Sequence, residues 1–348
     1  MPNILRTFAG EGGRQNGGEG GACQVPAGNV TMRRDTHGIS NRSMQVSVII
    51  VNYNTKKLTS ECIDSVFEKT RDVDFEVILV DNASTDGSAE HFALDKRITF
   101  IASPENIGFG RANNRGAEAG KGEYLLFLNP DTLLMNDAIS KMAEVMEGDE
   151  KIGICGGNLY DGYGEPTHSY GYITQTFSGY FKNIFFPVTL FPGMYEEHNK
   201  SDRVKSVGYI TGADLMIRHS VFDHVGGFCK EMFMYYEDVD LNYKVKKAGY
   251  KVMSVPEARI IHLVGKSMEG GDEADKTRRR RRMDAESQAV FLREHYRRGS
   301  ALLLLWIEKA HVRAKILILR LLRKDTSAYE ELIRQYKYTE QKVRGGGN

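Results

Sequence analysis

The stretch VSVIIVNYN at residues 46–54 decides the fold of this chain. An apolar, largely β-branched run is followed at once by polar residues, which is typical of a buried strand that ends at the edge of a sheet. A stretch with helical spacing of apolar residues follows at 58–69, and a second apolar run at 75–80 ends in Asp81. Together these segments predict a strand, a helix and a second strand parallel to the first.

The same alternation continues along the chain. Further strands are expected at 98–102, 124–128 and 152–155, and helices at 110–119 and 137–147. Helices that alternate with strands cover both faces of a parallel sheet. The sequence therefore predicts an α/β fold with a Rossmann-like, mainly parallel central sheet flanked by helices.

Polar residues directly follow three of these strands. They are Asn52, Tyr53 and Asn54 after the first strand, Asp81 and Asn82 after the second, and Asn129 and Asp131 after the strand at 124–128. In open parallel sheets ligands bind beyond the carboxyl ends of the strands, so we expect the functional site there. The glycines at 108 and 110 lack the third glycine of a dinucleotide fingerprint, which argues against a nicotinamide-dependent dehydrogenase.

The composition is that of a globular protein. Of 348 residues, 41% are hydrophobic and 27% are charged, which excludes wholesale disorder, collagen and a polytopic membrane protein. Four cysteines without a CxxC pair indicate reduced thiols rather than a disulfide framework or a zinc site.

The net charge of +1 hides two opposed blocks. Residues 278–324 hold 14 basic and four acidic side chains, a local charge of +10, so the rest of the chain sums to −9. Residues 1–44 are rich in glycine and poor in apolar clusters, so we expect a disordered tail, and it does not resemble a secretory signal. We expect a globular domain at 45–268 and a basic, amphipathic helical region at 269–348.

Two residues are candidate metal ligands. Asp131 lies just outside a buried strand, where a carboxylate can bind Mg²⁺ or Mn²⁺ because these cations prefer oxygen ligands. The alternative is a carboxylate that only caps the following turn. His262 follows a strand-like run at 258–261, and a site with one carboxylate has room for it, although a lone histidine is more often structural.

Three carboxylates, Glu237, Asp238 and Asp240, follow the aromatic run at 232–236. Crowded carboxylates beside apolar aromatics repel one another and lose solvent, which raises a pKa toward the range that suits a general base. The alternative is a set of acidic residues that only complements the dipole of a helix start.

In this order and at this spacing, the motifs resemble those of the family 2 glycosyltransferases. These are inverting enzymes of the GT-A fold, and the resemblance is greatest to the bacterial rhamnosyltransferase-like branch. It covers about residues 46–267. Its motifs are VSVIIVNYN at 46–54, VDNASTDGS at 80–88, NIGFGRANNRG at 106–116, FLNPDT at 127–132, VGGF at 225–228, EDVDL at 237–241 and AGY at 248–250.

The resemblance implies a nucleotide-sugar half at 45–132 and an acceptor half at 133–268. Asn52 and Tyr53, with Asp81, would line a pyrimidine pocket in which Asp81 accepts a hydrogen bond from the base. The further nucleotide-sugar residues that the resemblance implies are Asn54, Asn82, Asn106, Gly108, Arg111 and Asn129.

The same resemblance implies a metal site and a general base. Asp131 and His262 would hold Mg²⁺ or Mn²⁺, and Asn129 stands where the family commonly has a first aspartate. Glu237 and Asp238 match a Glu-Asp motif whose second residue is the general base. The residues implied on the acceptor side are Gly212, Ala213 and Asp214, and Cys229-Lys230 replace an Asp-Glu pair found in many relatives.

The implied function is transfer of a sugar from a nucleoside-diphosphate sugar, of the dTDP-rhamnose or UDP-hexose type, to a hydroxyl of a lipid-linked or cell-surface glycan. The alternatives are a sugar-nucleotide nucleotidyltransferase, although residues 52–55 lack the Gly-rich loop that it usually needs, and an inert, membrane-associated relative. Nucleic acid is not expected as a partner because no binding module is recognisable. The sequence predicts no particular oligomeric state.

The segment at 300–324 is apolar but interrupted by charges, so it has no run near the ~18 residues that span a bilayer. As a helix it would place Lys309, Arg313, Arg320, Arg323 and Lys324 within an arc of roughly 100°. This pattern indicates a helix on an anionic membrane surface, at the cytoplasmic face of the inner membrane. The alternative is a helix that packs on the catalytic domain or on another subunit. The arginines at 278–282 are by default a solvated charged face.

Overall fold

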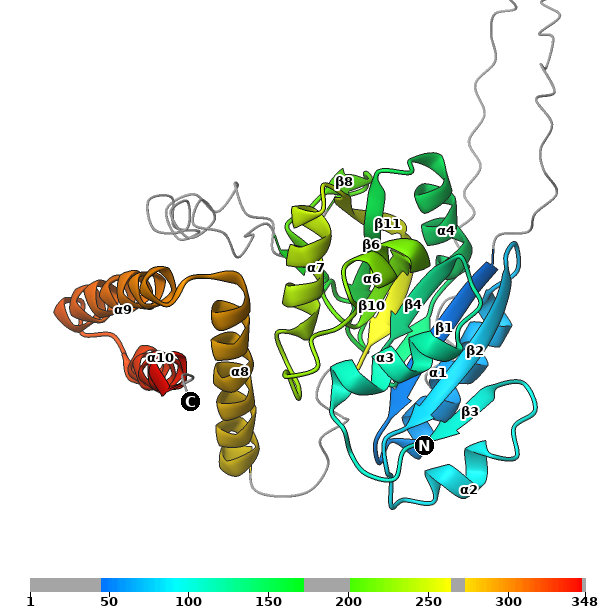
Figure 1. The fold of residues 1–348 in the computed structure, drawn as a ribbon, viewed down its shortest axis with the longest axis horizontal. Helices are drawn as coiled ribbons and strands as arrows, with labels where there is room; N and C mark the ends of the chain where they lie inside the picture. Colours follow the sequence, from blue (N-terminus) through cyan, green and yellow to red (C-terminus); the bar gives the residue numbers. More distant parts are fainter. Residues whose placement is uncertain (1–44, 172–200, 264–272, 346–348) are drawn as a thin grey trace, which may run out of the picture. The chain divides into compact units, whose positions relative to one another are not determined.

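The computed structural model describes residues 45–171, 201–263 and 273–345 (Figure 1). The tail predicted at 1–44 and the domain boundary predicted at 268 lie outside these residues. The strands are β1 Gln45–Asn52, β2 Asp74–Asp81, β3 Thr99–Ala102, β4 Tyr124–Leu128, β5 Thr132–Leu134, β6 Ile152–Tyr160, β7 Tyr170–Gly171, β8 Lys205–Ser206, β9 Tyr209–Ile210, β10 Asp214–Arg218 and β11 Lys251–His262. The helices are α1 Lys56–Lys69, α2 Ser88–Phe92, α3 Phe109–Ala119, α4 Ala138–Gly148, α6 His219–His224, α7 Glu237–Lys247, α8 Glu273–His295, α9 Arg298–Leu321 and α10 Ser327–Gly345.

The main sheet has the strand order β3-β2-β1-β4-β10-β6-β11-β5, and β8 pairs with β11 beside this path. β1 to β4 run parallel to one another, as do β6 and β11. The mainly parallel α/β sheet predicted from the sequence is therefore confirmed. β10 runs antiparallel to both of its neighbours, β4 and β6, and the alternation of strands and helices did not reveal this strand.

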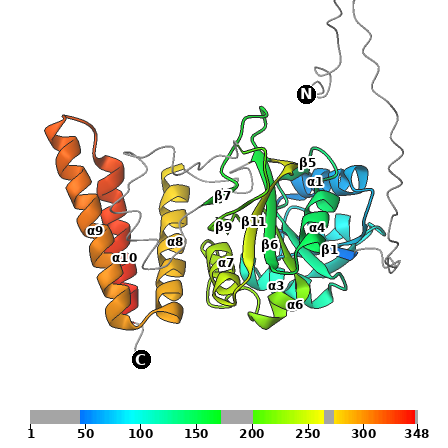
Figure 2. The same ribbon diagram turned by 90° about the horizontal axis from the view of Figure 1, so that it is seen from above.

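Helices cover both faces of this sheet because successive strand residues point to opposite sides. On β1, Val48 and Ile50 face a core shared with α1 and α4, whereas Ile49 faces a core shared with α3, α6 and α7. Figure 2 shows these two helical layers on either side of the strands. Every residue of β4 is buried, which places this strand in the centre of the fold.

The last three helices share a further apolar cluster with the segment that precedes α7. The cluster joins Met232 to Phe291 of α8, Leu304 and Leu305 of α9, and Val343 of α10. Helices α9 and α10 lie side by side in both views (Figures 1 and 2). All the described residues, from 45 to 345, accordingly belong to one compact unit.

The packing alternative is correct for one face of α9. Lys309, which the sequence pattern placed on a basic membrane edge, is buried and paired with Glu340 of α10, so its placement on that edge was wrong. Arg313, Arg320 and Lys324 are exposed, as expected. In the described ranges, no helix combines the length and the apolar character needed to cross a bilayer.

Candidate active site

The carboxyl ends of β1, β2 and β4 meet at one edge of the sheet. The strand register pairs Asn52 with Asp81 and Ile50 with Leu128. The polar residues that follow each apolar run are therefore neighbours in space, as the sequence predicted for a parallel sheet.

Asn52 holds the carboxylate of Asp81 in place. Its Nδ2 donates to Asp81 Oδ1 over 2.6 Å and to Ser84 Oγ over 2.9 Å. Its Oδ1 accepts from the hydroxyls of Thr55 and Thr59, both at 2.8 Å. Because these bonds occupy the amide, Asn52 supports Asp81 rather than offering a free group. Asp81 also accepts from the backbone N–H of Ser84, and its direct role toward a nucleotide stays a prediction.

Tyr53 and Asn54 occupy the turn after β1. The Tyr53 ring is 45% exposed. Asn54 has a φ of 56°, and its side-chain oxygen accepts from the backbone N–H of Thr85 at 2.7 Å. The turn after β1 is thereby fixed to the turn after β2, with an exposed aromatic ring beside both.

Asn82, Asn106 and Gly108 form the next part of the site. Asn82 Nδ2 donates to Asn106 Oδ1 at 2.9 Å, and this oxygen also accepts from the Gly108 N–H. Gly108 has a φ of 85°, and an added Cβ would lie 2.4 Å from the carbonyl oxygen of Phe233. Only glycine fits so close to another backbone segment. Arg111, in the first turn of α3, donates to the carbonyl of Lys230, which lies on the same segment as Phe233.

The metal-side group, which we define as Asn129, Asp131 and His262, is brought together by strand pairing. β5 and β11 pair His262 with Thr132, and Leu263 N–H donates to Asp131 O at 2.9 Å. His262 Nε2 lies 3.3 Å from Asp131 Oδ1 and 3.5 Å from Asn129 Nδ2.

These three residues fit a divalent cation. Asn129 Oδ1 is buried and has no hydrogen-bond partner among the described residues, although a buried polar atom is normally paired. An amide oxygen, a carboxylate and an imidazole nitrogen form a donor set that Mn²⁺ or Mg²⁺ accepts. Within the described ranges, no group of three His, Cys, Asp or Glu side chains could hold a metal, so a third donor from these residues would have to be the amide oxygen of Asn129.

The base-side group, Glu237 and Asp238, begins α7 after two residues in the left-handed region. Tyr235 and Tyr236 have φ values of 68° and 67°. Non-glycine residues adopt this conformation at a cost, so the surrounding structure must hold them there. Asp238 Oδ2 accepts from the Gly212 N–H at 2.9 Å, and its Oδ1 accepts from the Val239 N–H at 2.8 Å.

The surroundings of the two base-side carboxyl groups shift their pKa values differently. Burial first, and then the charge of Asp238, raises the pKa of Glu237 to about 8. Its Oε2 is buried and has no hydrogen-bond partner in the described part of the chain. Burial also raises the pKa of Asp238, but the two N–H donors lower it. Burial therefore favours the protonated form of Glu237, whereas two N–H donors favour the charged form of Asp238.

The three residues predicted on the acceptor side have different surroundings in the structure. The Gly212 N–H donates to Asp238, and the Ala213 carbonyl accepts from the Asn129 N–H at 2.9 Å. Asp214 is fully buried, and its Oδ2 accepts from the Gly157 N–H at 2.6 Å. Burial raises the pKa of Asp214 well above its usual value, and this side chain is part of the core rather than an exposed acceptor contact. A direct role toward an acceptor stays a prediction for Gly212 and Ala213.

Residues far along the chain support the base-side group, and the sequence did not reveal them. His295 Nε2 of α8 lies 2.6 Å from Asp240 Oδ1, and Lys244 Nζ lies 3.0 Å from the other oxygen of Asp240. Ser287 Oγ donates to the Met234 carbonyl at 2.9 Å. His168, whose charge lowers the pKa of Asp238, also escaped notice. No local motif marks the contacts of His295, Ser287 and His168, because each joins separate segments, whereas Lys244 pairs with Asp240 one turn away within α7.

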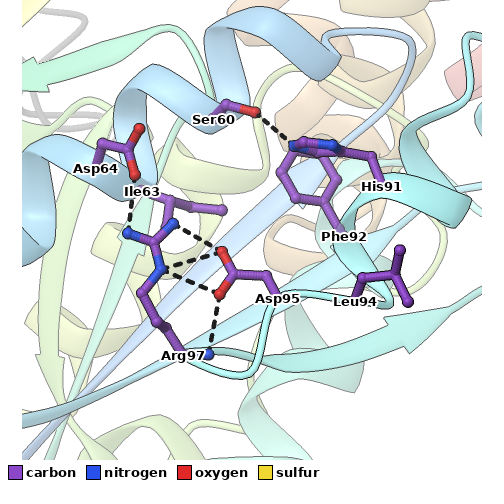
Figure 3. Close-up of a pocket in the computed structure, with 8 residues that line it drawn as sticks. All are labelled: Ser60, Ile63, Asp64, His91, Phe92, Leu94, Asp95 and Arg97. Carbon is purple, nitrogen blue, oxygen red and sulfur yellow. Dashed lines mark hydrogen bonds and ion pairs between the residues drawn. The ribbon is translucent and has the colours of Figure 1, made fainter.

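A cavity of about 460 Å³ lies beside α1 and contains none of the predicted site residues (Figure 3). Its lining consists of Ser60, Ile63, Asp64, His91, Phe92, Leu94, Asp95 and Arg97. Arg97 pairs with Asp95 at 2.7 Å and with Asp64 at 2.9 Å, so its charge is already compensated. We therefore assign these residues to the local structure of the sheet edge.

Known proteins resemble this chain in sequence and in fold. The profile described as Glycosyl transferase family 2 matches residues 47–226, which is more than half of the chain. The N-acetylglucosaminyl-diphospho-decaprenol L-rhamnosyltransferase of Mycobacterium tuberculosis is 28% identical over 202 residues, covering 53% of this chain and 66% of that protein. The chain thus spans slightly less than two thirds of the length of this relative.

Two solved structures share the fold. A mannosyltransferase of Pyrobaculum calidifontis, in complex with GDP-Man and Mn²⁺, has a TM-score of 0.53 and 17% identity, and the match covers 88% of this chain and 87% of that one. GalNAc-T7 with UDP, GalNAc and Mn²⁺ has a TM-score of 0.51 and 16% identity, covering 67% of this chain and 46% of that one. These matches confirm the fold that the resemblance implied.

Proposed function

Because the chain belongs to glycosyl transferase family 2 and has the GT-A fold, we propose that it moves a sugar from a nucleoside-diphosphate sugar to a hydroxyl of a lipid-linked glycan. The mycobacterial relative is named as an L-rhamnosyltransferase that acts on N-acetylglucosaminyl-diphospho-decaprenol, which supports a rhamnose donor, with dTDP-rhamnose as the first to test, and a polyprenyl-diphosphate-linked sugar as the acceptor. A UDP-hexose is the second donor to test.

The position of Asp238 is the observation that carries this proposal. Two backbone N–H groups orient its carboxylate at the sheet edge. In the proposed reaction Asp238 takes the proton of the acceptor hydroxyl while that oxygen attacks the anomeric carbon. The bond to the nucleoside diphosphate breaks in the same displacement, so the configuration inverts.

The metal-side group would face the departing diphosphate. Asp131, His262 and the free oxygen of Asn129 are the residues that would hold Mn²⁺ or Mg²⁺. A cation bound there would supply positive charge to the diphosphate oxygens. Asp81, kept in place by Asn52, would accept a hydrogen bond from the pyrimidine, with the exposed Tyr53 ring beside it.

We also propose that α9 lies on an anionic membrane surface at the cytoplasmic face of the inner membrane. Its exposed apolar side chains are Leu303, Trp306, Leu317, Ile318 and Leu321. Leu303, Trp306, Leu317 and Leu321 share one helical face, because 18 residues make about five turns. Exposed arginines, Arg313 and Arg320, lie beside that face, as expected of a helix bound to acidic headgroups.

The test of the transfer is a reaction of purified protein with dTDP-rhamnose and N-acetylglucosamine joined through a diphosphate to a short prenyl chain. We expect dTDP release and an inverted glycosidic bond, detected by NMR, only when Mn²⁺ or Mg²⁺ is present. Absence of transfer from both dTDP-rhamnose and UDP-hexoses would contradict the proposal.

The test of the membrane contact is flotation with phosphatidylglycerol vesicles. We expect the protein to float, and a Leu317→Gln, Leu321→Gln double variant to remain in solution. Leu94→Gln is the matched control, because Leu94 is 81% exposed and lies near the cavity beside α1. Equal flotation of both variants would contradict the assignment to α9.

A further inference from the structure

The arginine run of α8 lies next to the base-side group. The Arg280 guanidinium is 5.5 Å from the centre of the Tyr235 ring, which is two residues before Glu237. One turn further along α8, Asp284 lies close enough to Asp238 that the charge of Asp238 raises the pKa of Asp284. After one more turn, Ser287 Oγ donates to the Met234 carbonyl. The first half of α8 therefore faces the segment that carries the base.

The five arginines of this run differ in how their charges are compensated. Arg278 pairs with Asp275 at 3.9 Å, Arg281 with Glu331 at 3.3 Å and Arg282 with Glu286 at 3.2 Å. Across the described part of the chain, Arg279 and Arg280 have no carboxylate in ion-pair contact, and both are exposed. Neither guanidinium is therefore held in a direct ion pair there, although the charge of Arg280 lowers the pKa of nearby Asp284, and Arg280 lies over the Tyr235 ring.

We propose that Arg280, with Arg279 beside it, binds the diphosphate of the lipid-linked acceptor and so presents the sugar hydroxyl to Asp238. This inference rests on the proposed function. A guanidinium binds phosphate oxygens through two parallel N–H donors, and stacking on a ring restricts its rotamers before the ligand arrives. The carboxylates nearest to the site, Asp238 and Asp284, would repel a diphosphate, so the arginines also offset this repulsion.

An arginine that binds the acceptor diphosphate has a kinetic signature. In Arg280→Gln we expect the KM for the prenyl-diphosphate sugar to rise about tenfold, which corresponds to loss of one charge-assisted hydrogen bond. The kcat at saturation and the KM for dTDP-rhamnose should stay within about twofold of the parent protein. Arg282→Gln is the matched control, because Arg282 belongs to the same run but pairs with Glu286.

Two acceptors identify the diphosphate as the recognised group. Arg280→Gln should not change the KM for the same sugar on an octyl chain without a diphosphate. A binding experiment with farnesyl diphosphate, in the absence of vesicles, serves as the second arm. About tenfold weaker binding by Arg280→Gln, but not by Arg282→Gln, supports the site even if no transfer is seen. Lack of transfer would overturn only the proposed function.

The inference is wrong if farnesyl diphosphate binds both variants as it binds the parent protein. It is also wrong if Arg280→Gln loses only its flotation with phosphatidylglycerol vesicles, since the arginine would then bind bilayer headgroups rather than the acceptor. An equal rise in KM for both acceptors contradicts it as well, because that would indicate general damage to the base-side group.

Discussion

The two halves of the proposed site are held in place in different ways. In the metal-side group, the pairing of β5 with β11 aligns Asp131 and His262, and both lie on strands or directly beside them. In the base-side group, Asp238 follows two left-handed tyrosines whose neighbours contact α8, a helix some 50 residues further along the chain. The first half depends on the sheet and the second on the C-terminal helices. Substitutions far from the site should therefore affect the base and spare the metal ligands.

The largest effect is expected from Asp238→Asn. The amide keeps the shape and can still accept from the Gly212 N–H, but it cannot take a proton, so turnover should fall about 10²- to 10⁴-fold. Binding of dTDP, followed by thermal shift, should be unchanged. Turnover close to that of the parent protein would remove Asp238 from the role of base.

Asp131→Asn tests the other half. Loss of the charged ligand should weaken Mn²⁺ binding by about 100-fold, the upper part of the range for disturbed metal sites. The change can be followed by Mn²⁺ titration with electron paramagnetic resonance. Asp223→Asn, an exposed aspartate on α6, is the control. Mn²⁺ binding that is equal in both variants would exclude Asp131 as a ligand.

His295→Ala should distinguish the halves most directly. It leaves buried Asp240 without its α8 partner, which costs about 1–3 kcal/mol in unfolding free energy. As His295 is a positioning residue, kcat should drop about tenfold, corresponding to about 1.4 kcal/mol, while Mn²⁺ affinity and donor KM stay constant. His295→Gln, which can still donate to Asp240, should restore part of kcat. Exposed His224 provides the control variant, His224→Ala. A loss of Mn²⁺ affinity in His295→Ala as large as its loss of kcat would refute the separation of the two halves.

The last effect is on stability rather than on turnover, and it depends on pH. Because the folded pKa of Glu237 is about 8, against 4.5 ordinarily, the folded state binds more protons than the unfolded state between these values. Stability therefore falls as the pH rises through this window, by at most about 1.4 kcal/mol per pH unit. Glu237→Gln should flatten this dependence in urea unfolding from pH 5 to pH 9. An unchanged slope would show that Glu237 ionises freely.

The sequence predicted which polar residues lie at the carboxyl ends of the strands, but not the contacts that hold the base-side group in place, and the reason is physical. Asp81 and Asp131 each follow an apolar run, and the sheet brings the ends of such runs together without further information. The contact of His295 with Asp240 joins residues 55 apart on two helices, and no periodicity encodes it. The burial of Asp214 depends on β10 entering the sheet antiparallel between β4 and β6. The helical pattern predicted an exposed Lys309, because a pattern within one helix cannot show that Lys309 pairs with Glu340 on another helix.

The close approach of Gly108 to Phe233 has a consequence for engineering. The Phe109 N–H donates to the Phe233 carbonyl at 2.8 Å, so the start of α3 and the segment before α7 touch through their main chains. A chimaera that exchanges the acceptor half for that of another family member can therefore keep this junction whatever side chain stands at 233. It must retain glycine at 108, since even a methyl group would displace the segment that leads to Asp238.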